Sequence, residues 1–200
     1  AEYTYYKSSK MGTLNHAEII HSHEELRSDL NKTAYASYLA EMIYRLVTDD
    51  EPGSQFLFEQ LAAALQELAE GKDLQIVTHI FELKLLRYTG YEPVLSHCSL
   101  CGNREELEHF DAQAGGMVCR HCAASNQHRL LRIDEKTWKL LQVLQKVDLR
   151  KLGNIAVTPQ TKQQLGALMR SFMDYHTDAA YWKSRKFLDQ MEKYLNFPSL

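Results

Sequence analysis

Two short segments decide the fold, because each places a pair of cysteines three positions apart: Cys98-Ser99-Leu100-Cys101 and Cys119-Arg120-His121-Cys122. Seventeen residues separate Cys101 from Cys119, and this spacing is typical of zinc sites built from two Cys-x-x-Cys turns. Each turn brings two thiolates to one ion without stretching the backbone, and two turns complete a tetrahedron. The sequence therefore predicts a Zn²⁺ site with the ligands Cys98, Cys101, Cys119 and Cys122.

Two disulfides or four unrelated buried thiols are the alternatives to a metal site. The first six residues lack the basic and apolar regions of a secretion signal, so we expect a reducing compartment, where disulfides are rare. His97 and His121 flank the pairs and are the other candidate ligands. Because a site of four thiolates leaves no open position for water or substrate, the predicted role is structural rather than catalytic.

Turn-forming glycines support a hairpin between the two cysteine pairs. Gly102 follows the first pair, where the chain often needs a positive φ, and Gly115-Gly116 can turn a hairpin just before the second pair. The strands of this hairpin are predicted near 107–111 and 117–119. We expect a zinc module over residues 94–130, inserted between helical segments.

Helical periodicity covers most of the remaining chain. Apolar residues recur every three or four positions in six stretches: 34–47, 54–68, 73–86, 134–147, 158–176 and 181–195. The sequence Ser22-His23-Glu24-Glu25 resembles a capping box and predicts a further short helix. The first three long helices have short connections, which favours an antiparallel helical core.

Residues 3–20 have a β pattern instead, with aromatic and β-branched side chains such as Tyr3 and Ile19. Two or three strands are too few to be stable by themselves, so we expect the tail of a sheet whose start is absent. The predicted fold class is mainly α, a helical bundle with an inserted four-cysteine zinc-finger hairpin and a short N-terminal β remnant. The predicted boundaries are 1–22 for the β remnant, 23–200 for the helical domain and 94–130 for the insertion within it.

Composition and charge narrow the classes of function. The chain has 200 residues, of which 44% are apolar and 24% charged, as in ordinary globular proteins, and its apolar runs are too short for a transmembrane helix. The net charge of −3 argues against a highly basic nucleic-acid binder. The charge is uneven, however: residues 1–70 carry −7 and residues 120–151 carry +5, so one face can bind an anion.

Motifs of nucleotide binding, hydrolysis and metalloprotease chemistry are absent, since the sequence lacks G-x-x-x-x-G-K-[ST], G-x-G-x-x-G, G-x-S-x-G and H-E-x-x-H. We therefore expect a binding protein and not an enzyme. An enzyme with a zinc active site is disfavoured because the predicted site is closed.

The main functional candidates are basic residues behind the cysteines and in the last helix. They are Arg129, Arg132, Lys136, Lys139, Lys183, Arg185 and Lys186. Lys136 and Lys139 are three positions apart and share a helix face, as do Lys183 and Lys186. Such patches neutralise phosphates through counterion release, which predicts nucleic-acid binding. The alternatives are an ordinary solvated helix surface and a surface that receives an acidic protein tail.

One histidine and three tyrosines have structural interpretations. His176 lies on an apolar stripe, so we expect a core histidine with one satisfied nitrogen rather than a ligand. Tyr35, Tyr38 and Tyr44 have a spacing suited to core packing, with a stacking platform for bases as the alternative.

Several features occur in the order found in one known family. A β remnant with the turn Gly12-Thr13-Leu14 leads to helices carrying Thr33-Ala34-Tyr35-x-x-Tyr38-x-x-Glu41, and the cysteine module follows the third long helix. Asp148-Leu149-x-x-Leu152-Gly153-Asn154 comes next, and Ser184-Arg185-Lys186-Phe187-Leu188 lies near the end. In this order the chain resembles the RecO family of bacterial DNA repair and recombination mediators, from about residue 3 to 195.

The resemblance implies an N-terminal OB-fold, of which residues 1–22 would be the remnant and about 50 to 60 residues would be missing, since such a barrel needs five strands. It also implies binding of single- and double-stranded DNA and annealing of complementary strands. With the partner RecR, the family helps RecA load onto strands coated by single-strand-binding protein, and it contacts the acidic C-terminal tail of that protein.

The same resemblance implies no cofactor beyond zinc and no nucleotide hydrolysis. The cysteines match the family's zinc ligands, whereas no short motif identifies the DNA contacts. A cytoplasmic, nucleoid-associated protein that binds no membrane is expected. A rival hypothesis is a zinc-stabilised helical scaffold for protein interactions with no direct DNA role, which the acidic first 70 residues favour.

Overall fold

Helices make up most of the protein. The structure is a computed structural model that describes residues 2–7, 12–47, 53–126 and 128–195. Residues 193–195 are described by their backbone alone. The helices are α1 (Glu24–Arg27), α2 (Leu30–Leu46), α3 (Ser54–Ala69), α4 (Leu74–Tyr88), α5 (Arg120–Ser125), α6 (Glu135–Lys146), α7 (Pro159–His176) and α8 (Lys183–Leu195), with 3₁₀ turns η1 (Leu149–Lys151) and η2 (Ala179–Tyr181). None of the helices in these ranges is both long and apolar enough to span a bilayer.

Side-chain caps explain where several helices begin. The carboxylate of Asp73 accepts hydrogen bonds from two backbone N–H groups at the start of α4, and the carboxylate of Asp134 accepts one, from Thr137, at the start of α6. Thr158 caps α7, whose first residue is Pro159, as the sequence predicts. The capping box predicted at residues 22–25 does not form, because the residue before α1 is His23 in the left-handed region with no side-chain cap.

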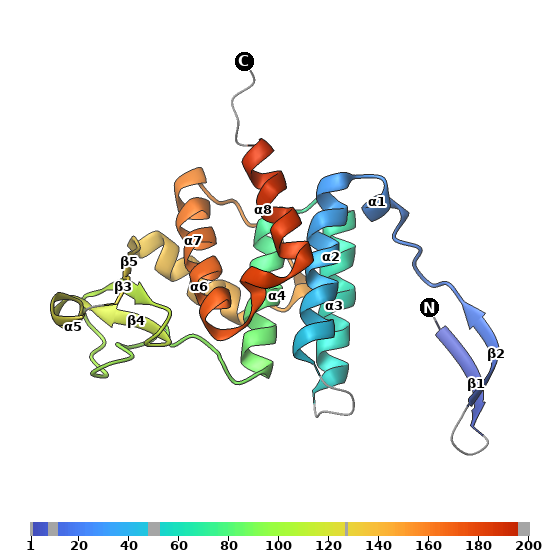
Figure 1. Cartoon of the computed structure of the whole chain (residues 1–200), viewed down its shortest axis with the longest axis horizontal. Coiled ribbons are helices and arrows are strands. Elements are labelled where there is room, and N and C mark those ends of the chain that lie inside the picture. Colours follow the sequence, from blue (N-terminus) through green and yellow to red (C-terminus); the bar gives the residue numbers. More distant parts are fainter. Residues whose placement is uncertain (1, 8–11, 48–52, 127, 196–200) are drawn as a thin grey trace.

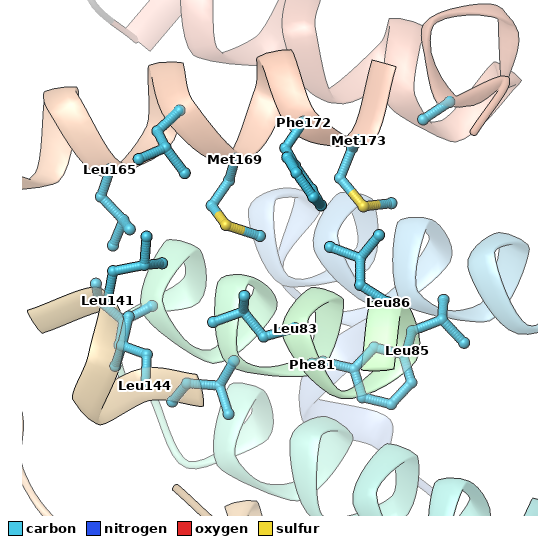
Figure 2. Close-up of a cluster of buried hydrophobic side chains, with 14 of the residues drawn as sticks. Phe81, Leu83, Leu85, Leu86, Leu141, Leu144, Leu165, Met169, Phe172 and Met173 are labelled. Carbon is cyan, nitrogen blue, oxygen red and sulfur yellow. The ribbon is translucent and has the colours of Figure 1, made fainter. Parts of the chain in front are cut away.

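The hydrophobic core is organised around α4. Every residue from Ile80 to Leu86 is buried, because α4 packs against α2 and α3 on one side and against α6 and α7 on the other. Figure 2 shows leucines of α4 and α6 meeting the apolar stripe of α7, which includes Leu165, Met169 and Phe172. Each such side chain contributes about 1.5–3 kcal/mol when fully buried, so the bundle has a core of its own.

The cysteine segment forms a small module at one end of the helical body (Figure 1). Its hairpin consists of β3 (Leu107–Asp111) and β4 (Gly116–Cys119), close to the predicted positions, and the short strand β5 (Leu131–Arg132) pairs with β3. Phe110 of β3 packs edge-to-face on Phe172 of α7, with ring centroids 5.5 Å apart. The module is therefore continuous with the hydrophobic core of the body.

A close backbone contact joins the module to its incoming chain. Val94 forms a parallel bridge with Gly116, and a Cβ atom on Gly116 would lie 2.2 Å from the Val94 carbonyl oxygen. We predict that Gly116→Ala destabilises the protein by about 1–3 kcal/mol or more, because backbone must move to make room. Urea unfolding checks this, with Gly153→Ala as the control because no heavy atom lies within 4 Å of its added Cβ. Equal stabilities of the two variants would contradict the prediction.

The N-terminal segment is a β-hairpin, as predicted. Strands β1 (Glu2–Lys7) and β2 (Gly12–Glu18) pair antiparallel, and every residue of both is exposed. Figure 1 shows the hairpin at the end of the molecule opposite to the cysteine module. Tyr3, Tyr5 and Tyr6 are each more than 60% exposed. The origin of this hairpin in an OB-fold stays a prediction.

Candidate metal centre and basic surface

The four cysteines converge. Their sulfur atoms all lie within 4.8 Å of one another, and Sγ of Cys101 is 3.7 Å from Sγ of Cys119. A tetrahedral site with metal–sulfur distances of roughly 2.3 Å has sulfur–sulfur edges of about 3.8 Å. The observed arrangement therefore fits one metal ion held by four thiolates, and the cysteines are free of disulfides.

Local backbone geometry positions these thiols. The backbone N–H of Gly102 donates to the Cys98 carbonyl at 2.9 Å, and Gly102 has φ of 77°, as predicted for the turn after the first pair. Cys119 ends β4, and Cys122 lies one turn later in α5, a short helix that the sequence analysis missed. The hairpin and α5 thus bring the second pair against the first.

The thiols differ in their readiness to ionise. Burial by itself raises the pKa of Cys98, but backbone hydrogen bonds from Cys119, Cys101 and Leu100 outweigh it and lower the pKa to about 6. Hydrogen bonding with the Cys101 thiol, together with smaller effects of burial and other thiols, raises the pKa of Cys122 to about 12. Four thiols this close cannot all ionise unless a cation offsets their charge, which is the role a metal would take.

Neither neighbouring histidine belongs to the group. His97 and His121 are absent from the set of converging ligand atoms found among the described residues. Nδ1 of His97 instead lies 2.9 Å from the hydroxyl of Ser96. The donor set is therefore purely sulfur, which suits a soft or borderline ion in a closed, structural site.

The basic candidates behind the cysteines are all exposed. They are Arg129, Arg132, Lys136 and Lys139. Arg132 lies 3.7 Å from Glu108, and Lys139 lies 2.6 Å from Glu135 one helical turn earlier. Arg129 and Lys136 have no ion-pair partner in the part of the chain that the structure describes, so their charges are open to an external anion.

The candidates in α8 divide into two exposed lysines and one buried arginine. Lys183 and Lys186 are exposed, and Lys186 lies 6.0 Å from the centre of the Tyr181 ring. Arg185, by contrast, is only 5% exposed, and we correct its assignment to the basic surface. Its position on the apolar stripe of α8, three residues before the buried Leu188, turns it toward the core.

Arg185 takes part in a buried polar cluster that the sequence analysis missed. Its Nη1 donates to the hydroxyl of Tyr38 at 2.9 Å, and that hydroxyl donates to Oε1 of Glu82 at 2.8 Å. Nδ1 of His79 is 2.7 Å from the second oxygen of Glu82. The backbone N–H and hydroxyl of Ser184 also donate to Glu41. Two sequence motifs far apart in the chain, in α2 and α8, therefore meet.

Despite its burial, the cluster favours a charged Glu82 and a neutral Tyr38. Burial raises the pKa of the Glu82 carboxyl, but the neighbouring His79 and Arg185 outweigh this effect and hold the pKa below its usual value. The pKa of Tyr38 is raised well above its usual range, first by burial and then by the charge of Glu82. Glu82 is thus a buried carboxylate that is hydrogen-bonded and paired, which is the condition under which such a charge is tolerated.

The structural interpretations of the other side chains hold with one exception. Nε2 of His176 lies 2.9 Å from the carbonyl oxygen of Ala112, so this histidine has one satisfied nitrogen, as predicted. Tyr35 and Tyr38 are buried, whereas Tyr44 is 81% exposed, and its predicted core position is wrong. Residues six apart on a helix point about 120° apart, so Tyr44 cannot share the buried face of Tyr38.

The matches to known proteins cover nearly the whole chain. Residues 27–186 match the family model described as the recombination protein O C terminal. The DNA repair protein RecO of Listeria monocytogenes serotype 4b (strain CLIP80459) is 34% identical over 196 residues, which is 97% of this chain and 75% of that protein. The DNA repair protein RecO of Bacillus subtilis (strain 168) is 35% identical over 186 residues, which is 93% of this chain and 72% of that protein.

Proposed function

The chain belongs to the RecO family, and on this premise we propose that it is a DNA-binding recombination mediator in DNA repair that catalyses no reaction itself. The resemblance found in the sequence is confirmed by these matches. The observation that carries the proposal is the match to DNA repair proteins over 97% of the chain. The exposed cations around the cysteine module supply a chemical means of holding a polyanion.

We infer that the metal is zinc. Four sulfur ligands in a closed tetrahedral arrangement are the donor set of structural zinc sites, and the 3.7 Å contact between Cys101 and Cys119 agrees with that size. Zinc would supply no chemistry on a substrate here. The four thiolates would instead hold the turn after Val94, strand β4 and helix α5 together, and so support the nearby basic residues.

The proposed mechanism needs only binding. Exposed arginine and lysine side chains hold the phosphates of two strands, which lowers the repulsion between the strands so that complementary bases can pair. Loading of RecA with RecR on strands coated by single-strand-binding protein is part of this proposal, and it rests on the family relationship. Lys183 and Lys186 on α8 are candidates for the acidic tail of single-strand-binding protein, since they are exposed cations beside the partly exposed ring of Phe187.

We predict that reversing two charges on α6 weakens DNA binding. The variant Lys136→Glu/Lys139→Glu should bind single-stranded DNA at least tenfold more weakly, because two cations are replaced by two anions at the phosphate surface. Its plot of log affinity against log salt concentration should also be less steep, by about 0.7 per lost phosphate contact. Filter binding at several salt concentrations measures both quantities.

A matched control reverses two exposed arginines on other helices. Arg27→Glu/Arg45→Glu makes the same change of total charge on α1 and α2, which do not pack on α6, and should leave the salt dependence nearly unchanged. If both double variants lose affinity equally, the effect is one of net charge and α6 is not in the site. If the unmodified chain binds no DNA at any of these salt concentrations, the scaffold hypothesis is favoured instead.

A further inference from the structure

A cleft lies where the cysteine module meets the helical body. Its volume is about 520 Å³, and it lies between the segment after β3, the chain leading to β5 and one face of α7. Two of its lining residues are already committed to each other: the buried carboxylate of Asp111 lies 2.9 Å from Nδ1 of His128. This contact holds the module side of the cleft in place. The other side of the cleft is formed by α7.

An aromatic side chain lies at this cleft on firm support. Tyr175 of α7 is 54% exposed, and its ring packs edge-on to His176 with centroids 5.0 Å apart. His176 in turn packs on Phe172 at 4.3 Å and contacts the Ala112 carbonyl. His176 therefore supports the ring of Tyr175 from one side, while more than half of the surface of Tyr175 faces solvent. An exposed ring held in this way is what stacking of a nucleobase requires.

The polar groups of the cleft include a cation, a carboxylate and a hydroxyl that are not engaged. Arg129, Asp174 and Ser171 line the cleft, and none of the three side chains has an ion pair or hydrogen bond with another described residue. The pKa of the Asp174 carboxyl is raised, and the largest cause is the partial burial of this side chain. A carboxylate inside the cleft makes a pure phosphate site unfavourable. It does suit the N–H donors on the edge of a base, while Arg129 suits the phosphate beside it.

We propose that this cleft holds one unstacked base of single-stranded DNA. Tyr175 stacks on the base, Asp174 accepts hydrogen bonds from the N–H groups on its edge, and Arg129 contacts the adjoining phosphate. The inference rests on the proposed DNA binding and adds a base-holding site to it. Because duplex bases are stacked and paired, only a single strand can fill this site without the cost of opening the helix. Guanine fits Asp174 best, since it presents two neighbouring N–H donors.

The test compares two strands of equal length, one with bases and one made of abasic nucleotides. The full chain should bind the base-bearing strand about tenfold more tightly, because stacking of one base contributes an effect of that order. Tyr175→Leu should remove this difference by weakening only the base-bearing strand. Tyr44→Leu is the matched control, an exposed tyrosine on α2 away from the cleft, and should keep the difference.

A second variant tests the base edge. Asp174→Asn should abolish a preference for a strand with guanines in a thymine background over an all-thymine strand. If the unmodified chain binds the base-bearing and abasic strands equally tightly, with steep salt dependence, the base site is wrong while the proposed DNA binding stands. If Tyr175→Leu and Tyr44→Leu weaken binding equally, the base site is also wrong. Absence of binding to either strand would overturn the proposed function as well.

Discussion

Removal of the metal by a chelator is expected to loosen residues 94–130 and to leave the helical body folded. The ion would cross-link the turn at Cys98 to β4 and α5, and structural zinc contributes about 10 kcal/mol or more to the folding of small modules. The long helices pack through their own apolar faces around α4 and do not need the ion. Backbone hydrogen exchange in 94–130 should rise at least tenfold, while circular dichroism keeps most of the helical signal.

The control is a variant that has already lost the site. Cys98→Ser/Cys119→Ser removes the two buried ligands, so its hydrogen exchange should be fast in 94–130 and insensitive to the chelator. Added Zn²⁺ should restore protection in the unmodified chain alone. The module shares the contact between Phe110 and Phe172 with the body. If this coupling dominates, the whole helical signal will disappear in one cooperative step, and the independence of the body will be disproved.

The parts of the fold that could be predicted from the sequence are those determined by local chemistry. The Cys-x-x-Cys spacing by itself limits where the four thiols can lie, and they converge as expected. Asp73 and Asp134 were predicted to begin helices, and each caps the first turn of one. Strand β3 lies at residues 107–111, as the sequence predicts, since the turn-forming glycines before and after it are visible within one short window.

The parts that could not be predicted depend on how distant segments dock. Arg185 and Glu82 are more than 100 positions apart, and neither position alone indicates that the two would be buried together. One signal was present: Arg185 lies three residues before Leu188, so the two side chains share an apolar face of α8. A cation on an apolar stripe points to a buried partner as well as to a surface patch. The cleft beside Tyr175 gave no signal, because the module and α7 that form it are separate in the sequence.

The second large effect is expected at this buried arginine. Arg185→Met should destabilise the folded protein by about 3–5 kcal/mol, because it leaves Glu82 and Tyr38 buried without the cation that Arg185 supplies. Lys186→Met is the control, since it changes the neighbouring exposed cation, and should shift stability by less than about 0.5 kcal/mol. Urea unfolding measures both. An Arg185→Met variant that keeps full stability but loses DNA affinity would show that Arg185 reaches DNA after all.

The pH dependence of stability reports on the same carboxylate. The folded-state pKa of Glu82 is lowered from about 4.5, so its contribution to stability is complete above that pH and is lost as the pH falls through the lower folded value. Glu82→Gln cannot titrate, so its stability should fall less steeply than that of the unmodified chain on acidification. The double variant Glu82→Gln/Arg185→Met should lose about 1–3 kcal/mol less free energy of unfolding than the two single variants lose together. The reason is that Glu82→Gln leaves the charge of Arg185 unpaired, and Arg185→Met removes that charge. Strict additivity of the two free energies would mean that these groups do not depend on each other, and the burial of Arg185 would then need another cause.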